Sequence, residues 1–287
     1  MLNTTSPDRQ RIPLWLQLPI FALVGCCLVV LAVAIFIHFQ QHSLIYHPHP
    51  YGRIYEHVLP PNGVEIQYTL PFGKQTAFYI PPPNDPAKRV WVAFCGNGSL
   101  ALDWTGLVHG YPPNGDAFLL IDYPGYGKNS GYATIASTRA TADGAVQALA
   151  QRLQMDEARL VLCTIGHSLG AAAALDFAVH HRVQHVVIVA PFTSLRDEAA
   201  TVVGQHLAYL LSENYDNREN IRELFKRDPQ VRVDIYHGTD DNDIPVGMGR
   251  ALADECPSIR YHEIPGADHM TVMENARDQI IATMNER

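Results

Sequence analysis

The sequence predicts an α/β fold in which helices flank a mostly parallel central sheet. Six short apolar runs alternate with helix-like segments from residue 90 onward, a pattern typical of parallel strands that are buried on both faces. The pentapeptide Gly-x-Ser-x-Gly, residues 166–170, separates one of these runs from an alanine-rich segment. The 287 residues, 47% of them hydrophobic, are enough for one such domain of about 240 residues after a separate N-terminal segment.

The N-terminal segment contains an uncharged, mostly apolar stretch at residues 18–37. A stretch of this length crosses the hydrocarbon core of a bilayer as a helix. Arg9 and Arg11 precede it, whereas the next Lys or Arg is Arg53. The excess of positive charge before the span predicts a single-pass topology, with residues 1–17 in the cytoplasm and the rest of the chain periplasmic or otherwise extracytoplasmic.

Two processing signals compete with an uncleaved anchor. Residues 32–34, Ala-Val-Ala, resemble a signal-peptidase site, and residues 23–26, Leu-Val-Gly-Cys, resemble a bacterial lipoprotein box. Apolar residues continue beyond both sites, whereas cleavage normally ends the apolar region. The pattern therefore favours the uncleaved anchor and leaves processing open.

The other elements follow in chain order after a connector at residues 38–53. Turns rich in Pro, Gly and Asn separate three short runs, which we expect to be antiparallel strands at 54–59, 64–70 and 75–80. The six buried runs predict parallel strands at 90–94, 117–121, 160–165, 186–190, 231–236 and 259–264. The segments between them predict helices at 100–109, 137–153, 171–180, 246–255 and 270–285. One insertion, residues 193–229, is expected to form a small helical cap.

Ser168, at the centre of the pentapeptide, is the candidate nucleophile. An apolar strand precedes it, and four alanines, residues 171–174, follow it. At such a strand-to-helix turn the serine hydroxyl projects above the sheet, and the flanking glycines let the backbone pass closely. Alanine is a strong helix former whose small side chain lets a helix pack tightly against the strands beside it. The context therefore favours a nucleophile over an ordinary turn serine.

A serine nucleophile needs two partners. Its hydroxyl is weak until an imidazole accepts the proton, and a carboxylate must hold that imidazole in the right tautomer. His269 suits the first role because it lies in a turn after the last predicted strand and just before the last helix. Asp240, Asp241 and Asp243 all lie in the loop after the strand at 231–236, and each is a candidate for the second role.

The composition argues against several other kinds of site. The net charge is -8 and no basic block occurs, so we expect no nucleic-acid partner. The spacing of the five cysteines and fourteen histidines matches no metal-binding motif. We therefore expect neither a metal nor an organic cofactor, while a disulfide pairing and the oligomeric state stay open.

Four motifs connect these candidates to a known family. They are residues 94–98 (Phe-Cys-Gly-Asn-Gly), 122–127 (Asp-Tyr-Pro-Gly-Tyr-Gly), 166–170 (Gly-His-Ser-Leu-Gly) and 237–245 (His-Gly-Thr-Asp-Asp-Asn-Asp-Ile-Pro). Over residues 54–287 the chain resembles the α/β-hydrolase superfamily, and within it the single-span, membrane-anchored serine hydrolases of the α/β-hydrolase-domain type. The resemblance implies an α/β-hydrolase catalytic domain at residues 54–287, with nucleophile, acid and base in that order along the chain.

The resemblance also implies roles for individual residues. The family spacing His-Gly-x-x-Asp-x-x-Ile-Pro selects Asp241 as the acid of a triad with Ser168 and His269. The oxyanion formed during acyl transfer needs donors that are fixed in advance. The family supplies them as the backbone N–H after the nucleophile and one from the loop after the third strand, which here are Leu169 and Asn97.

Tyr126 is a candidate for the wall of the substrate pocket, with cover of apolar surface as the alternative reading. Cys95, which stands where the family usually has a histidine, is a second candidate for this wall. We expect a carboxylesterase or acyl hydrolase that cleaves a small acyl ester or thioester through an acyl-serine intermediate and is held at the membrane. A small serine peptidase or amidase, and an inactive scaffold, remain alternatives, although a scaffold has no need of an intact triad. Residues 202–211 of the cap have a helical spacing of apolar side chains, so this face either packs on the domain, which we expect, or contacts a bound acyl chain. Because the cap is small and a soluble assay offers no membrane, we expect the isolated domain to prefer short or medium acyl chains.

Overall fold

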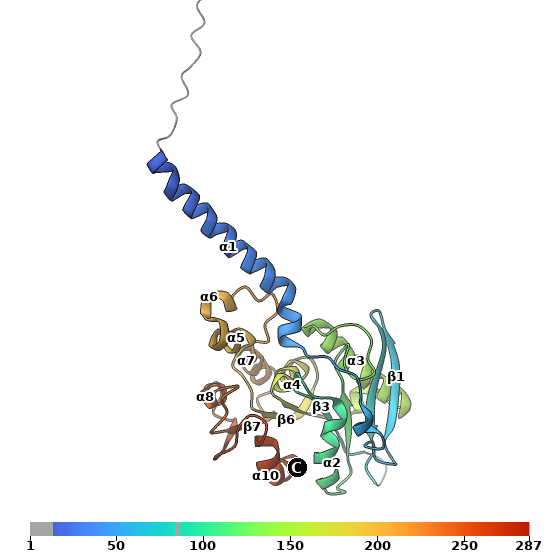
Figure 1. The fold of residues 1–287 in the computed structure, drawn as a ribbon. Helices are drawn as coiled ribbons and strands as arrows, with labels where there is room; N and C mark the ends of the chain where they lie inside the picture. Colours follow the sequence, from blue (N-terminus) through green and yellow to red (C-terminus); the bar gives the residue numbers. More distant parts are fainter. Residues whose placement is uncertain (1–13, 84–86, 287) are drawn as a thin grey trace, which may run out of the picture.

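The computed structural model describes residues 14–83 and 87–286 (Figure 1). At its centre lies an eight-stranded sheet with the strand order β1-β2-β4-β3-β5-β6-β7-β8. The strands are β1 (Val64–Leu70), β2 (Gly73–Ile80), β3 (Arg89–Phe94), β4 (Asp116–Ile121), β5 (Leu162–His167), β6 (Val183–Val189), β7 (Arg232–Gly238) and β8 (Arg260–Ile264). β2 pairs antiparallel with β1 and β4, and the six strands β3 to β8 are parallel to one another. The expected α/β fold is confirmed.

Outside the insertion between β6 and β7, four of the described helices of the domain lie between strands along the chain, and two more follow β8. They are α2 (Thr105–Gly110), α3 (Ile135–Arg152), α4 (Leu169–His180), α8 (Val246–Ala253), α9 (Val272–Asn275) and α10 (Arg277–Asn285). α4 packs against β3, β5 and β6, with α3 beside it, whereas α2 packs against α10. The four alanines at the start of α4 are buried, and their small side chains allow the close packing of helix on strand that a dense core requires.

The parallel pairing brings the candidate residues together. β3 and β5 are in register with Phe94 beside Gly166, and β7 and β8 with Gly238 beside Ile264. The carboxyl ends of these strands therefore meet at one edge of the sheet, which is where open α/β sheets bind their ligands. The segments that follow β3, β5, β7 and β8 carry, in turn, Asn97, Ser168, Asp241 and His269.

The insertion between β6 and β7 is helical. It contains α5 (Leu195–Val203), α6 (Gln205–Ala208) and α7 (Asn217–Arg227). Ser194 and Asp216 cap α5 and α7 by accepting backbone N–H bonds, as short polar side chains do at helix starts. Gly204, with φ +82°, turns the chain between α5 and α6. α7 packs against α4, while α5 and α6 pack against each other.

The N-terminal helix α1 (Leu14–Ile45) extends away from the domain (Figure 1). A stretch of 19 residues within it, Leu18–Phe36, has a mean hydropathy of 2.9, and the other described residues bury none of this stretch. A helix of this length and composition near the start of a chain is typical of a membrane anchor or a signal sequence. Arg9 and Arg11 lie outside the described residues, so the orientation of the chain stays a prediction.

The C-terminal end of α1 and the residue that follows it are part of the domain. Gln41, Ile45 and Tyr46 are buried, and the Gln41 Oε1 accepts a 2.9 Å hydrogen bond from the backbone N–H of Ser212. The ring of Tyr46 meets the edge of the Tyr123 ring. The segment expected to connect span and domain from residue 38 is therefore helical as far as Ile45, and it is docked on the domain.

Two expected elements are wrong in detail. Residues 54–59 form no strand: a 3-10 helix, η1 (Arg53–Tyr55), is followed by turns, and His57 has the left-handed φ of +67°, which an extended strand does not accommodate. The expected helix at 270–285 begins at Val272 and breaks at Ala276. Asp268 delays its start because the Oδ1 accepts the N–H groups of Met270 and Thr271.

Candidate active site

The turn between β5 and α4 presents Ser168 at a strained backbone position. Its φ of +57° and ψ of -122° lie outside the regions that non-glycine residues normally occupy. A Cβ on Gly166 would lie 2.0 Å from the Gly170 carbonyl oxygen, and one on Gly170 would lie 2.2 Å from that of Phe94. Neither glycine can therefore be replaced without a shift of backbone, which explains why the motif has glycine at both positions.

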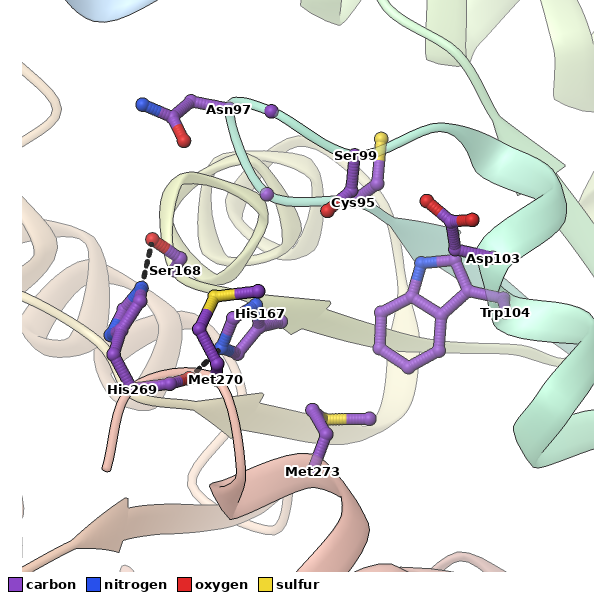
Figure 2. A pocket seen from close by; sticks show the side chains of 12 residues that line it. Cys95, Asn97, Ser99, Asp103, Trp104, His167, Ser168, His269, Met270 and Met273 are labelled. Carbon is purple, nitrogen blue, oxygen red and sulfur yellow. Dashed lines mark hydrogen bonds between the residues drawn. The ribbon is translucent and has the colours of Figure 1, made fainter. Parts of the chain in front are cut away.

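Ser168, His269 and Asp241 form a continuous chain of hydrogen bonds. The Ser168 hydroxyl lies 3.0 Å from His269 Nε2, and His269 Nδ1 lies 2.8 Å from Asp241 Oδ2. Figure 2 shows the first of these contacts at the base of a cavity. Asp240 accepts from the Thr239 hydroxyl instead, and Asp243 gives its backbone N–H to Asp241. Among the three candidate carboxylates, the geometry singles out Asp241.

The surroundings of Asp241 keep its carboxylate charged. Its Oδ1 accepts the N–H groups of Asp243 and Ile244 at 3.0 and 2.8 Å. Burial alone would raise the pKa of this carboxyl, but hydrogen bonds from His237, His269 and the Ile244 N–H outweigh burial and hold the pKa well below its usual range. Asp241 therefore accepts the Nδ1–H of His269, which leaves Nε2 free to accept the serine proton.

The pKa of His269 is shifted in the opposite direction. Burial lowers the pKa of the imidazole, but the hydrogen bond to Asp241 and the negative charges of Asp241, Asp243 and Glu198 outweigh burial and raise it. An imidazole with a raised pKa is a stronger base. The three carboxylates therefore favour proton transfer from Ser168 to His269.

His167 supports the loop that carries His269. Its Nε2–H donates to the His269 carbonyl oxygen at 3.0 Å, and the two rings lie 4.9 Å apart. Burial and the neighbouring His269 lower the pKa of His167 to about 4, so its ring is neutral at physiological pH. A neutral His167 places no second positive charge beside the imidazolium that forms on His269.

The two residues expected to supply the oxyanion donors, Leu169 and Asn97, line one cavity together with Ser168. Leu169 is the first residue of α4, where a backbone N–H has no acceptor within the helix. Asn97 lies in the loop after β3, beside the same cavity as Ser168. Tyr126 holds that loop in place: its hydroxyl donates to the Asn97 carbonyl at 2.7 Å and accepts the His47 N–H at 2.6 Å.

Of the two residues considered for the wall of the pocket, Cys95 borders a cavity at Ser168 and Tyr126 does not. Tyr126 is fully buried beneath the loop that carries Asn97 and borders neither of the cavities at Ser168, so that expectation is corrected. Its hydroxyl is engaged in the two hydrogen bonds described above. Cys95 does border the first cavity, but its Sγ faces the Ile121 carbonyl at 3.9 Å. Burial raises the pKa of this thiol, which is therefore unreactive.

The segment after α1 also supports the oxyanion loop, which the sequence did not reveal. His49 Nε2 lies 3.1 Å from the Gly98 carbonyl, and the Tyr51 hydroxyl donates to Asp122 Oδ2 at 2.5 Å. The other Asp122 oxygen accepts the Ala101 N–H at 2.8 Å. Burial raises the pKa of Asp122 to about 6 despite these hydrogen bonds. No local motif signals these contacts because the partners are far apart in the chain.

Two cavities meet at the candidate nucleophile. The first, about 300 Å³, extends from Ser168 towards Asp103, Trp104 and Met273 (Figure 2). The second, about 480 Å³, extends beneath the cap and has a mostly apolar wall. Both are lined by Asn97, Ser168, His269 and Met270. Volumes of this size suit small organic ligands.

The second cavity contains one unusual polar group. Glu198 of α5 lines it, and the Oε2 atom is buried with no hydrogen-bond partner among the described residues. Burial raises the pKa of this carboxyl to about 7, although the positive charge of His269 acts in the opposite direction. Within residues 14–83 and 87–286, no group of three or more His, Cys, Asp or Glu side chains is placed to hold a metal ion.

Comparisons with known proteins agree with this fold. The Pyrococcus furiosus esterase PF2001 has a similar structure, with a TM-score of 0.64 and 14% identity over 84% of this chain and 95% of its own. Uncharacterized protein Rv2307c of Mycobacterium tuberculosis is 30% identical over 259 residues, which are 88% of each chain. Human alpha/beta hydrolase domain-containing protein 17C is 28% identical over 152 residues, 52% of this chain and 42% of its own.

Residues 86–232 match the family described as serine aminopeptidase, S33. The matched residues include Ser168 and end before Asp241 and His269. This match covers half of the chain, and the mycobacterial relative extends the similarity over most of the rest. The chain therefore belongs to the α/β-hydrolase superfamily, in the serine aminopeptidase S33 family.

Proposed function

We propose that this protein is a serine hydrolase that cleaves carboxylic esters or thioesters through an acyl-serine intermediate. The observation that carries the proposal is the chain of hydrogen bonds from Ser168 through His269 to Asp241, at 3.0 and 2.8 Å. A nucleophile, a base and an orienting acid in this geometry define the catalytic arrangement of serine hydrolases. The similarity in fold to an esterase supports the same reading.

In the first half of the reaction, Ser168 Oγ attacks the acyl carbonyl carbon while His269 Nε2 accepts the hydroxyl proton. Asp241 stabilises the imidazolium through its bond to Nδ1. The N–H groups of Leu169 and Asn97 bind the oxyanion of the tetrahedral intermediate. His269 then donates this proton to the departing alcohol or thiol, and the acyl group remains on Ser168.

In the second half, a water molecule replaces the leaving group. His269 accepts a proton from the water as the water oxygen attacks the acyl-serine carbonyl, and the same two N–H groups bind the second oxyanion. Collapse of this intermediate releases the carboxylic acid and returns the proton to Ser168. The cycle needs only protein groups and water.

The wall of the second cavity favours an ester or thioester over a peptide substrate. A pocket with a mostly apolar lining matches a hydrocarbon acyl group better than a polar peptide chain. Amide cleavage requires the same catalytic groups, so a small peptidase or amidase is the alternative that a substrate panel must include. The helix α1 and the charges before it favour a membrane-anchored enzyme whose domain lies outside the cytoplasm.

The experiment is a comparison of Ser168→Ala with wild type across esters, thioesters and amides. Purified full-length protein is assayed in detergent. Ser43→Ala is the matched control because Ser43 is exposed and its hydroxyl bonds, within the described residues, to Gln40 alone. We expect Ser168→Ala to lose essentially all ester and thioester hydrolysis. Activity near that of wild type in this variant would remove Ser168 from the mechanism, and hydrolysis of amides alone would favour the peptidase.

A further inference from the structure

The C-terminal end of α1, which is docked on the domain, forms part of the wall of the second cavity. Leu44 and Ile45 line it on one side, and Val202 and Val203 of α5 and Leu207 of α6 line it on another. Ile45 is buried, whereas Leu44 is 61% exposed. A residue that both lines a cavity and faces outward lies at its mouth, so the cavity opens between α1 and the cap.

The cap that borders this mouth carries exposed apolar side chains. Val202 is 80% exposed and Tyr209 is 65% exposed, on the same cap that borders Leu44. Figure 1 shows α5 and α6 on the side of the domain from which α1 departs. Exposed apolar groups that gather next to a candidate span are typical of a surface in contact with lipid.

The position of the mouth along α1 fits this contact. Leu44 lies eight positions after Phe36, the end of the apolar stretch, and a helix rises about 1.5 Å per residue, or about 12 Å over this interval. The headgroup region of a bilayer adds roughly 5–7 Å to each side of the hydrocarbon core. With the span in a bilayer, the mouth therefore opens close to the headgroups rather than into distant solvent.

We propose that the second cavity is an acyl-chain site that is loaded from the lipid side. The chain of a membrane-embedded acyl amphiphile passes between Leu44 of α1 and Val203 of α5, and its carbonyl carbon reaches Ser168 at the inner end. The first cavity, which Ser99 and Asp103 border, then takes the more polar leaving group. This inference rests on the proposed function of the same site.

The consequence is a preference that depends on α1. Each methylene that moves from water into an apolar cavity strengthens binding about fourfold, so the specificity constant of the full chain rises with acyl length until the cavity is filled. The preference for short or medium chains, expected above for the isolated domain, is a prediction for a site without α1. That fragment lacks Leu44 and Ile45, and hence one wall of the cavity.

The test uses the full chain in phosphatidylcholine nanodiscs, with p-nitrophenyl acetate and p-nitrophenyl laurate as probes. The readout is the ratio of kcat/KM for laurate to that for acetate, which cancels differences in the amount of folded enzyme. Leu44→Trp and Val203→Trp narrow the mouth from its two sides, and each is expected to lower the ratio about tenfold or more. Leu28→Trp, an exposed position in the middle of α1, is the control and keeps the wild-type ratio within about twofold.

The outcomes separate this inference from the proposed function. A wild-type ratio well above one that falls in both mouth variants supports the acyl-chain site. Hydrolysis of acetate with a ratio that neither mouth variant changes overturns the inference and leaves the serine hydrolase intact. If Leu28→Trp lowers the ratio of kcat/KM as much as the mouth variants do, the inference is also overturned. Failure of wild type to hydrolyse any ester would contradict the proposed function itself.

Discussion

The sheet edge around Ser168 and the cap that faces it differ in how tightly their residues are held. At the sheet edge, Gly166 and Gly170 have no space for a methyl group, and Asp241 has hydrogen bonds to both of its oxygens. In the cap, α5 exposes Val202, and the Oε2 atom of Glu198 has no hydrogen-bond partner in the described part of the chain. In the proposed mechanism, catalysis therefore depends on rigidly held groups, while the choice of substrate depends on a surface that tolerates substitution.

This difference has a physical reason. Proton transfer and oxyanion binding require donors and acceptors placed within a few tenths of an ångström, which buried and fully bonded groups provide. Recognition of an acyl chain needs only apolar contact, which is nondirectional and proportional to area. Substitutions at the sheet edge should consequently have much larger effects than substitutions in the cap.

The largest effect is expected at Asp241. Asp241→Asn removes the negative charge and favours the wrong tautomer of His269, and should lower kcat about 10⁴-fold. Asp240→Asn is the matched control because Asp240 bonds to Thr239 and not to His269. Steady-state kinetics of both variants with one ester measure the difference. If Asp240→Asn or Asp243→Asn proves the more damaging change, Asp241 is not the acid.

Substitutions by alanine should distinguish the two regions by their effect on stability. Gly170→Ala places a Cβ 2.2 Å from the Phe94 carbonyl and should cost about 3 kcal/mol or more, because backbone must move. Val202→Ala, at an exposed position of the cap, should change stability by less than about 0.5 kcal/mol. Gly98→Ala is a control in which a Cβ meets nothing within 4 Å. Thermal unfolding that ranks Val202→Ala with Gly170→Ala would contradict the comparison.

An intermediate effect is expected at Tyr126. Tyr126→Phe removes the hydrogen bonds to Asn97 and His47 that hold the oxyanion loop. We expect kcat to fall about tenfold with a smaller change in KM, because the loop acts mainly on the transition state. Tyr132→Phe, on an exposed tyrosine, should be silent. A change in KM alone would show that Tyr126 acts on substrate binding instead.

The smallest effect is expected for the carboxylate in the cap. The base works only when His269 is neutral, and the negative charges of Asp241, Asp243 and Glu198 raise its pKa. Glu198→Gln removes one of these charges, so the pKa of His269 falls and the acidic limb of the kcat/KM profile moves to lower pH. The shift should be about half a pH unit, since the pKa of Glu198 is itself about 7 and the group is only partly charged there. Glu219→Gln, at an exposed position of α7, is the control. A shift of the acidic limb to higher pH in Glu198→Gln would contradict the argument.

The sequence predicted the sheet and the turn at Ser168 better than it predicted the packing of the cap and of α1. Each parallel strand leaves a local signal, because a strand buried on both faces is a continuous apolar run, and the turn at Ser168 has a local glycine pattern. The order along the chain led to His269 and to a loop with three candidate aspartates, of which the family spacing selected Asp241. The structure places His269 in contact with both Ser168 and Asp241. Their catalytic roles stay a prediction until activity is measured.

The contacts that the sequence did not predict are long-range. Tyr126 meets His47 across 79 residues, and no local pattern records that pairing. The apolar spacing of α5 is the same whether that face packs on the domain, as we expected, or lines a cavity, as Val202 and Val203 do. The extension of α1 to Ile45 depends in the same way on docking, through Gln41, against the cap segment at Ser212.

The account depends most directly on Ser168 being an activated nucleophile. Full-length protein treated with a fluorophosphonate probe, digested and analysed by mass spectrometry, reports which residue carries the adduct. We predict one adduct, on Ser168, that forms rapidly in wild type and is lost in His269→Ala, because the hydroxyl is reactive only when the imidazole accepts its proton. Folded wild-type protein that remains unlabelled, or that is labelled elsewhere while Ser168 is unmodified, would contradict the proposed mechanism.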